Sequence, residues 1–334
     1  MDPLIVFHYG CADGLGALWA ARQALPTAEV WGGSYGQPPP PRERYVGRDV
    51  VLVDFSYPRA VLEEMATTAR SVLVLDHHST ARDDLSKLVE AEPDWPEWIA
   101  SVEESDGAPR LAALFDMSRS GAGITWDYFH PGKERPRIID LIEDRDLWRF
   151  KYGPETRAFD ANLRLWDMTK WETIVSYLGV LDMWSRDGDK AMWATELAQG
   201  AAIVKFQAQA VEMILATSTR SMTIFGQNVP VANCPGQFAS EAGNSLVTAY
   251  TTAPFAATYY EGEDGYRHFS LRSGPEGLHV GKLAKLLGER PGWNGGGGHP
   301  RAAGANAPLG WEGEDEQEAV QLDAGEGEVP APRQ

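Results

Sequence analysis

The first half of the chain alternates short apolar runs with longer stretches in which apolar positions recur at helical spacing. The runs Leu4–Tyr9, Asp49–Phe55 and Ser71–Leu75 have the length and β-branched content of buried strands. Helical periodicity follows two of them, at Gly14–Leu25 and Pro58–Ala69. Because strand–helix–strand alternation builds parallel sheets, the pattern predicts an α/β domain around a doubly wound, mostly parallel sheet.

The pattern changes in the second half. Helical stretches at Ser118–Phe129 and Arg137–Leu147 complete the first domain, and one long helical stretch from Gly188 to Thr217 then links the two halves. Beyond it we expect a hairpin, two strands and a helix, at Ser221–Ala232, Phe255–Tyr260, Tyr266–Arg272 and Val280–Leu287. This order indicates a smaller mixed α/β domain. The chain is therefore predicted to have a first domain at residues 1–187, a helical linker at 188–218, a second domain at 219–310 and a tail at 311–334.

Charge and composition narrow the class of protein. The 334 residues carry a net charge of -18 and include two cysteines. Residues 311–334 hold eight acidic residues and one basic residue, or -7, which leaves -11 for the rest and predicts a disordered acidic tail, with an acidic docking segment as the alternative. The scarcity of cysteine, the short apolar runs and a start unlike a signal peptide predict a cytoplasmic protein without membrane spans.

Metal-capable side chains stand where three of the predicted strands end. His8 and Asp13 follow the first strand, Asp54 ends the second, and Asp76-His77-His78 ends the third. Ligands of doubly wound sheets bind beyond the carboxyl ends of the strands, so neighbouring strand ends would bring these groups together. Carboxylates and imidazoles bind Mn²⁺, Mg²⁺ or Zn²⁺, and paired ions serve phosphoryl chemistry. We expect a two-metal phosphoesterase site with Asp54 as a bridging ligand.

Two further segments carry candidate chemistry. The acidic segment Glu143–Asp146 lies beside an apolar run, so one of its acids is expected to face the interior as a ligand. The run Gly295–Gly298 can offer backbone N–H groups to an anion, and His299 and Arg301 add donors beside it. Arg272, on a preceding strand, is a second candidate contact for a phosphate or carboxylate.

These features, in this order, resemble the DHH phosphoesterases (RecJ-like and nano-RNase-like proteins) that carry a DHH-associated C-terminal domain. The resemblance covers nearly all of residues 4–306. It rests on His8 with Asp13-Gly14, on Asp54, on Asp76-His77-His78, on Asp146 before Trp148, and on Gly296-Gly297-Gly298-His299 with Ala302-Ala303-Gly304.

The resemblance implies a role for each of these residues. The metal ligands would be His8, Asp13, Asp54, His77 and Asp146, holding two divalent ions, with Mn²⁺ expected first and Mg²⁺ or Zn²⁺ as alternatives. The catalytic triplet would be Asp76, His77 and His78, with His78 supporting the site or contacting the phosphate. Residues 1–187 would be the DHH catalytic domain. The substrate would be bound by Arg272, Gly297, Gly298 and His299, with Arg301 as a further candidate, in a cleft between the two domains.

The first motif departs from the family pattern. Family members commonly have His, three residues, Asp, one residue and Asp, whereas this motif is one residue shorter and has Cys11 in place of the first Asp. Cys11 is therefore either a ligand for a softer metal or a buried, inert thiol. Asp144 is an alternative to Asp146 as the distant ligand.

Members of the family act on different phosphate esters. Compact length and strong acidity favour short oligonucleotides or small nucleotides, hydrolysed at a phosphodiester or phosphomonoester bond. Two alternatives stay open, a single-strand-specific exonuclease of the RecJ type and a nucleotide-binding regulatory protein with weakened catalysis. No membrane partner is expected, and a homodimer is left open.

Overall fold

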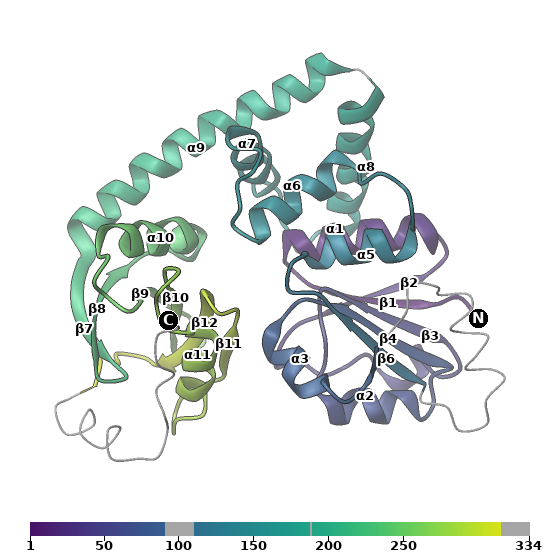
Figure 1. The fold of residues 1–334 in the computed structure, drawn as a ribbon, viewed down its shortest axis with the longest axis horizontal. Coiled ribbons are helices and arrows are strands. Elements are labelled where there is room, and N and C mark those ends of the chain that lie inside the picture. The colour runs from purple at the N-terminus through teal and green to yellow at the C-terminus, as the bar shows by residue number, and fades with distance from the viewer. Residues whose placement is uncertain (91–109, 188, 315–334) are drawn as a thin grey trace. The chain divides into compact units, whose positions relative to one another are not determined.

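The computed structural model describes residues 1–90, 110–187 and 189–314, and the chain divides into two compact units, Met1–Val204 and Lys205–Gln334. Helix α9 (Lys190–Ser218) runs across this boundary as one element (Figure 1).

The first unit is built on a six-stranded sheet in which every described strand pair is parallel. Its strand order is β2-β1-β3-β4-β6-β5. The strands are β1 (Leu4–His8), β2 (Glu29–Gly33), β3 (Asp49–Val53), β4 (Ser71–Asp76), β5 (Val89–Glu90) and β6 (Leu111–Phe115). The helices are α1 (Ala12–Ala24), the 3₁₀ turn η1 (Arg42–Arg44), α2 (Arg59–Ala66), α3 (Ser79–Leu85), α5 (Gly121–Phe129), α6 (Arg137–Asp146), α7 (Pro154–Leu163) and α8 (Trp171–Asp187). The predicted doubly wound α/β fold is confirmed.

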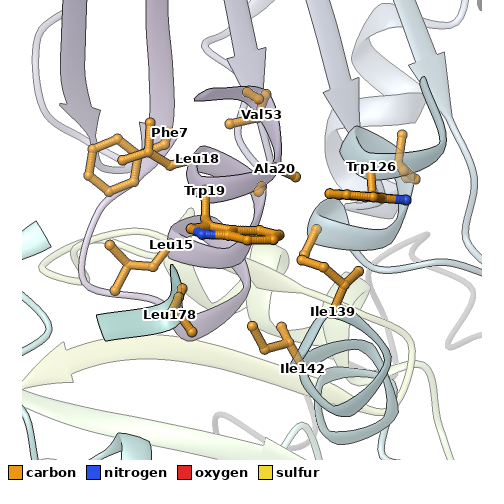
Figure 2. Close-up of a cluster of buried hydrophobic side chains, with 14 of the residues drawn as sticks. Phe7, Leu15, Leu18, Trp19, Ala20, Val53, Trp126, Ile139, Ile142 and Leu178 are labelled. Carbon is orange, nitrogen blue, oxygen red and sulfur yellow. The ribbon is translucent and has the colours of Figure 1, made fainter. Parts of the chain in front are cut away.

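The central strands are buried on both faces, and alternate residues of each strand belong to two different hydrophobic cores. Phe7, Val53 and Leu75 point to the layer of α1, α5 and α6, whereas Val6 and Val74 point to the layer that contains α2. On the first face the Trp19 ring of α1 stacks on the Trp126 ring of α5 at a centroid distance of 5.8 Å (Figure 2).

The second unit has its own six-stranded sheet, in the order β11-β12-β10-β9-β8-β7, with β8 and β9 parallel and the other described pairs antiparallel. Its elements are β7 (Thr219–Ile224), β8 (Gln227–Asn233), the 3₁₀ turn η2 (Gly236–Phe238), α10 (Ala239–Ala249), β9 (Ala256–Glu261), β10 (Tyr266–Arg272), α11 (Val280–Gly288), β11 (Gly296–Gly298) and β12 (Ala302–Pro308). The predicted mixed α/β second domain is confirmed, and the hairpin predicted near Ser221–Ala232 is β7 and β8.

Part of the predicted acidic tail is packed on this unit. Trp311 lies against the second core, and the buried carboxylate of Glu314 accepts hydrogen bonds from the backbone N–H groups of Phe225 and Gly226 at 2.8 and 2.6 Å. Glu314 therefore holds the β7–β8 turn, where both residues have positive φ. Residues 315–334, the rest of the predicted tail, lie outside the described residues.

Three strands of the first sheet were not predicted, namely β2, β6 and the two-residue β5. β2 is a short edge strand whose residues are mostly half-exposed, and β6 has the short sequence LAALF without alternation. Such runs carry little periodic signal, and parallel pairing with β1 and β4 fixes them as strands. None of the helices in the described ranges is long and apolar enough to span a bilayer.

Candidate metal centre

The register of three neighbouring strands brings the predicted site residues of the first unit to one edge. β1 pairs with β3 so that Phe7 lies beside Val53, which sets His8 and Asp54 at adjacent strand ends. The N–H of Asp54 then bonds the carbonyl of Leu75 at 2.9 Å, next to Asp76. Asp54 has a φ of 55°, a left-handed conformation that costs about 1–3 kcal/mol outside glycine and recurs at functional sites.

The Asp54 carboxylate lies between two imidazoles. Its Oδ2 is 3.4 Å from His8 Nδ1, and its Oδ1 is 3.2 Å from His77 Nε2. The side chain is buried, yet neither oxygen makes a hydrogen bond of good geometry with the described residues. Burial alone would raise the pKa of Asp54, but the two imidazoles hold that pKa well below its usual value. The site thus contains an ionised, buried carboxylate with unused acceptor capacity.

Asp13 enters from the first turn of α1 and is held by the N-terminus of α5. Its two oxygens accept the N–H groups of Gly121 and Ala122 at 2.6 and 3.0 Å. Glycine is required at 121 because a Cβ there would lie 2.3 Å from the Cβ of Asp54. Burial, together with the negative charges of Asp54 and Asp146, raises the pKa of Asp13 well above its usual value.

His77 is surrounded by carboxylates. Its Nε2 lies 3.6 Å from Asp13 Oδ2, 3.2 Å from Asp54 Oδ1 and 3.6 Å from Asp146 Oδ2. Burial lowers the pKa of His77, but the adjacent Asp54 carboxylate, together with Asp146 and Asp13, raises that pKa above its usual value. Three acids around one imidazole leave excess negative charge that a divalent cation would neutralise.

Asp144 and Asp146 have different surroundings. Asp144 is buried and accepts the N–H groups of Lys151 and Tyr152 at 2.7 and 3.2 Å and the hydroxyl of Thr156. It therefore organises the loop after α6. Asp146, at the end of α6, is the acid of this segment that lies beside His77.

Asp76 orients the other two residues of its triplet. Its Oδ1 accepts the backbone N–H groups of His77 and His78 at 2.7 and 3.2 Å, and it is 2.7 Å from Nδ1 of the His78 ring. Asp76 is completely buried, which by itself raises its pKa, but the adjacent His78 holds the pKa below its usual value.

Donor atoms in the first unit form two adjacent groups of metal-ligand geometry. His8, Asp54 and His78 form one group, and Asp13, His77 and Asp146 form the other, with the donor atoms of each group within 4.8 Å of one another. Asp54 joins them, because its second oxygen faces His77. Imidazole and carboxylate donors, with unsatisfied buried oxygens on Asp54, fit two divalent cations.

Cys11 belongs to neither group. It is the N-cap of α1, is partly buried and makes no side-chain capping hydrogen bond. Burial and the charges of Asp54, Asp146 and Asp13 raise the pKa of its thiol well above the usual value. From the resemblance we expected His78 to support the site or to contact the phosphate. In the structure its ring lies 5.8 Å from the His8 ring, and both residues belong to the same group of donors.

Aromatic rings that were not predicted lie against this side of the site. The Tyr35 ring is 5.5 Å from that of His8 and 5.8 Å from that of His78, and Phe55 stacks on His8 at 6.0 Å. Tyr35 follows β2, a strand the sequence pattern did not reveal. The helix N-terminus that holds Asp13 could have been found from the sequence. The Ser-Gly-Ala-Gly segment at the start of α5 is typical of a capped helix N-terminus, and Ser120 is the capping residue.

In the second unit, Arg272 has a defined orientation. Its guanidinium donates to the Ser270 hydroxyl at 2.9 Å, to the Leu271 carbonyl at 2.8 Å and to the Ser240 hydroxyl at 3.0 Å. The N–H of His299 donates to the Ala302 carbonyl at 2.8 Å in the turn between β11 and β12, and Arg301 in that turn is exposed.

Most of the glycine run forms the strand β11. Gly296–Gly298 pair with β12 and pack on α11. A Cβ on Gly296 would lie 1.9 Å from the Ala284 carbonyl oxygen, and one on Gly281 would lie 2.5 Å from the Gly298 carbonyl oxygen. Absence of side chains therefore allows a strand and a helix to approach closely.

The chain is similar to known proteins over both units. Residues 236–322 match the DHHA1 domain family. Uncharacterized protein R106 of Acanthamoeba polyphaga mimivirus is 26% identical over 318 residues, which cover 90% of this chain and 66% of the relative, slightly under two thirds of its length.

Three solved structures are similar to this chain, and the first of them shows the same fold. The DHH domain of a member of a family of ribosomal proteins superposes with a TM-score of 0.52 at 13% identity, covering 97% of this chain and 86% of that one. A pGpG-specific phosphodiesterase from Vibrio cholerae gives a TM-score of 0.47 at 13% identity, with 97% and 99% covered. RecJ from Thermus thermophilus, in complex with Mn²⁺, gives 0.44 at 17% identity, with 97% and 51% covered. The predicted resemblance to DHH-type proteins with a DHH-associated C-terminal domain is confirmed.

Proposed function

We propose that this chain, which carries a DHHA1 domain and has the fold of DHH-type proteins, is a metal-dependent phosphoesterase. One observation carries the proposal. The buried Asp54 carboxylate has no well-formed hydrogen bond to the described residues and lies between His8 on one side and His77, Asp13 and Asp146 on the other. Burying so many acids costs free energy unless cations compensate them.

Two divalent ions fit this site, and the donor types suit Mn²⁺, with Mg²⁺ and Zn²⁺ as alternatives. His8, Asp54 and His78 would hold one, and Asp13, His77 and Asp146 the other, with Asp54 shared. Such ions supply Lewis acidity toward a phosphate oxygen and acidify a water.

The chain's own residues position the reacting groups. Asp76 holds the backbone of His77 and His78 and the ring of His78 through three contacts to one oxygen, so the His78 imidazole is oriented before any ligand arrives. The α5 N-terminus does the same for Asp13. We infer that Arg272 and His299 of the second unit bind the substrate's anionic groups, because Arg272 is held by three acceptors and presents a planar fork of donors.

The substrate class that we propose is short oligonucleotides or small nucleotides. A net charge of -18 repels a long polyanion, whereas a few phosphates can be matched by local cations. Two alternatives remain as outcomes of the test, a RecJ-type exonuclease and a regulatory protein that binds nucleotide without turnover.

The test is a hydrolysis panel with Mn²⁺ on wild type, Asp54→Asn and Glu64→Gln. The panel comprises dinucleotides, longer single strands, cyclic dinucleotides, 3′-phosphoadenosine 5′-phosphate and polyphosphate. We expect turnover of the small nucleotides, a loss of roughly 100-fold or more in Asp54→Asn, and no change in Glu64→Gln, which alters an exposed acid on α2. Faster cleavage of long strands favours the exonuclease, and tight nucleotide binding without hydrolysis favours the regulatory protein. Unchanged hydrolysis in Asp54→Asn would rule out the proposed site.

A further inference from the structure

Helix α9 has one face that packs on the rest of the chain. Toward the first unit, Gly200 lies so close to α7 that a Cβ would be 1.8 Å from the Ala158 carbonyl oxygen. Toward the second unit, Val211 is buried against Cys234 and Phe238. Gly200 and Val211 are about three helical turns apart, so both contacts lie on one stripe of the helix.

The opposite face of α9 is exposed and almost free of charge. Phe206 and Met213, seven residues apart, are 66% and 68% exposed. Ala202, Gln209 and Ala216 are also exposed and complete the alternating four- and three-residue spacing. This is the spacing of a and d positions in a helix that pairs with another helix. We call Ala202, Phe206, Gln209, Met213 and Ala216 the outer stripe.

Scattered apolar residues are ordinary on protein surfaces, so the exposure of Phe206 and Met213 does not by itself indicate a binding surface. The charges beside the outer stripe are more informative. From residue 202 to 216 the helix has two charged residues, Lys205 and Glu212. Both are exposed, and each precedes a large apolar residue of the stripe, so they occupy equivalent flanking positions one heptad apart.

This arrangement is complementary to itself under a two-fold axis. When two α9 helices pack antiparallel, Phe206 faces Gln209 of the second copy and Met213 faces Ala202 of the second copy. Large side chains then meet smaller or flexible ones. In the same register Lys205 of each copy flanks Glu212 of the other, which gives two opposite-charge contacts. A parallel pairing in register leaves both charges without an oppositely charged neighbour.

We propose that the outer stripe of α9 binds a second copy of this chain, as an antiparallel helix pair with Lys205 opposite Glu212 at both ends. The contact involves about four turns of helix from each copy, which is a small interface, so the dimer should dissociate in the micromolar range, about 1–100 µM. Such a dimer does not depend on the proposed enzymatic function.

Sedimentation equilibrium of the full chain, from about 1 to 200 µM, tests the proposal with a charge swap. Lys205→Glu or Glu212→Lys alone creates two like-charge contacts and should weaken the dimer by about tenfold. The double variant Lys205→Glu/Glu212→Lys restores both opposite-charge contacts and should recover affinity to within about threefold of wild type. Arg42→Glu, a charge reversal at an exposed position of the first unit, is the matched control and should leave the dimer unchanged.

The charge-swap variants distinguish the antiparallel helix pair from other modes of dimerisation. A chain that stays monomeric over the whole range overturns the proposal. A dimer that is indifferent to both single variants also overturns it, as does one that the double variant fails to restore. Circular dichroism of each variant establishes that the helix content is kept, so that a loss of dimer is read as a loss of contact.

Discussion

The carboxylate of Asp76 lies 2.7 Å from Nδ1 of His78 and, because its pKa is held low, accepts a hydrogen bond from that nitrogen. This contact fixes the tautomer of His78, since a ring that donates through Nδ1 can ligate through Nε2. The residue that begins the triplet therefore acts on the site through its neighbour.

Replacing Asp76 by Asn should weaken metal binding without unfolding the protein. The amide keeps the shape of the side chain but loses the charge that orients and polarises His78. We expect the affinity for Mn²⁺ to fall by about 10- to 100-fold, as for other residues that support metal ligands. Calorimetric titration with Mn²⁺ measures this affinity, and Glu64→Gln serves as the control. An affinity equal to that of wild type would remove Asp76 from this role.

Replacing Cys11 by Ser should leave Mn²⁺ affinity within about threefold of wild type, a difference of roughly 0.6 kcal/mol. The reason is geometric, because the donor groups around Asp54 and His77 do not include the Cys11 sulfur. The same titration, repeated with Zn²⁺, provides the comparison with a softer ion. A large loss confined to Zn²⁺ would make Cys11 a ligand after all.

Replacing Gly281 by Ala should destabilise the second unit, although alanine favours helices by about 1 kcal/mol. The added Cβ would lie 2.5 Å from the Gly298 carbonyl oxygen, so α11 and β11 must separate. We expect the unfolding free energy to fall by about 1–3 kcal/mol. Gly304→Ala is the control, because its nearest neighbour would be 3.4 Å away. Scanning calorimetry distinguishes the two, and equal stability of both variants contradicts the close packing.

The acid stability of the first unit should depend on Asp127. Burial raises its pKa, but hydrogen bonds from Arg135 and Arg119 hold the pKa below its usual value of about 3.9. A lowered pKa stabilises the fold above the unfolded-state value, and this stabilisation is lost as the pH falls through the folded-state value. The side chain is about a third exposed, so we expect a modest effect of about 1 kcal/mol at pH 7.

Urea unfolding of wild type and Asp127→Asn at several pH values measures this effect. The two free energies should differ at pH 7 and converge as the pH falls through the folded-state pKa, below which Asp127 is protonated in both states. A constant difference over that range would assign the effect to packing instead of charge. Glu64→Gln, which removes an exposed charge on α2, should show no such convergence.

Sequence patterns predicted the elements that have strong periodicity and the residues that end them. β1, β3 and β4 are apolar on both faces, so they stand out as buried strands, and His8, Asp54 and Asp76 follow from their ends. β2 and β6 were not predicted, because a short run becomes recognisable as a strand only through its pairing with a neighbouring strand. The position of the Tyr35 ring beside His8 was not predicted for the same reason, because the loop that carries Tyr35 follows β2.

By itself the sequence determined the fold class, the strand ends that carry metal-capable side chains, and the resemblance to DHH-type proteins, because hydrophobic period and residue type are local properties. Only the tertiary structure decided that Asp146 is the acid near His77 and that Asp144 instead accepts hydrogen bonds from the loop after α6. It also decided that the glycine run forms a strand that packs on a helix. These outcomes depend on what lies across space from each residue. Strand register and helix packing set that neighbourhood, and no pattern along the chain records it.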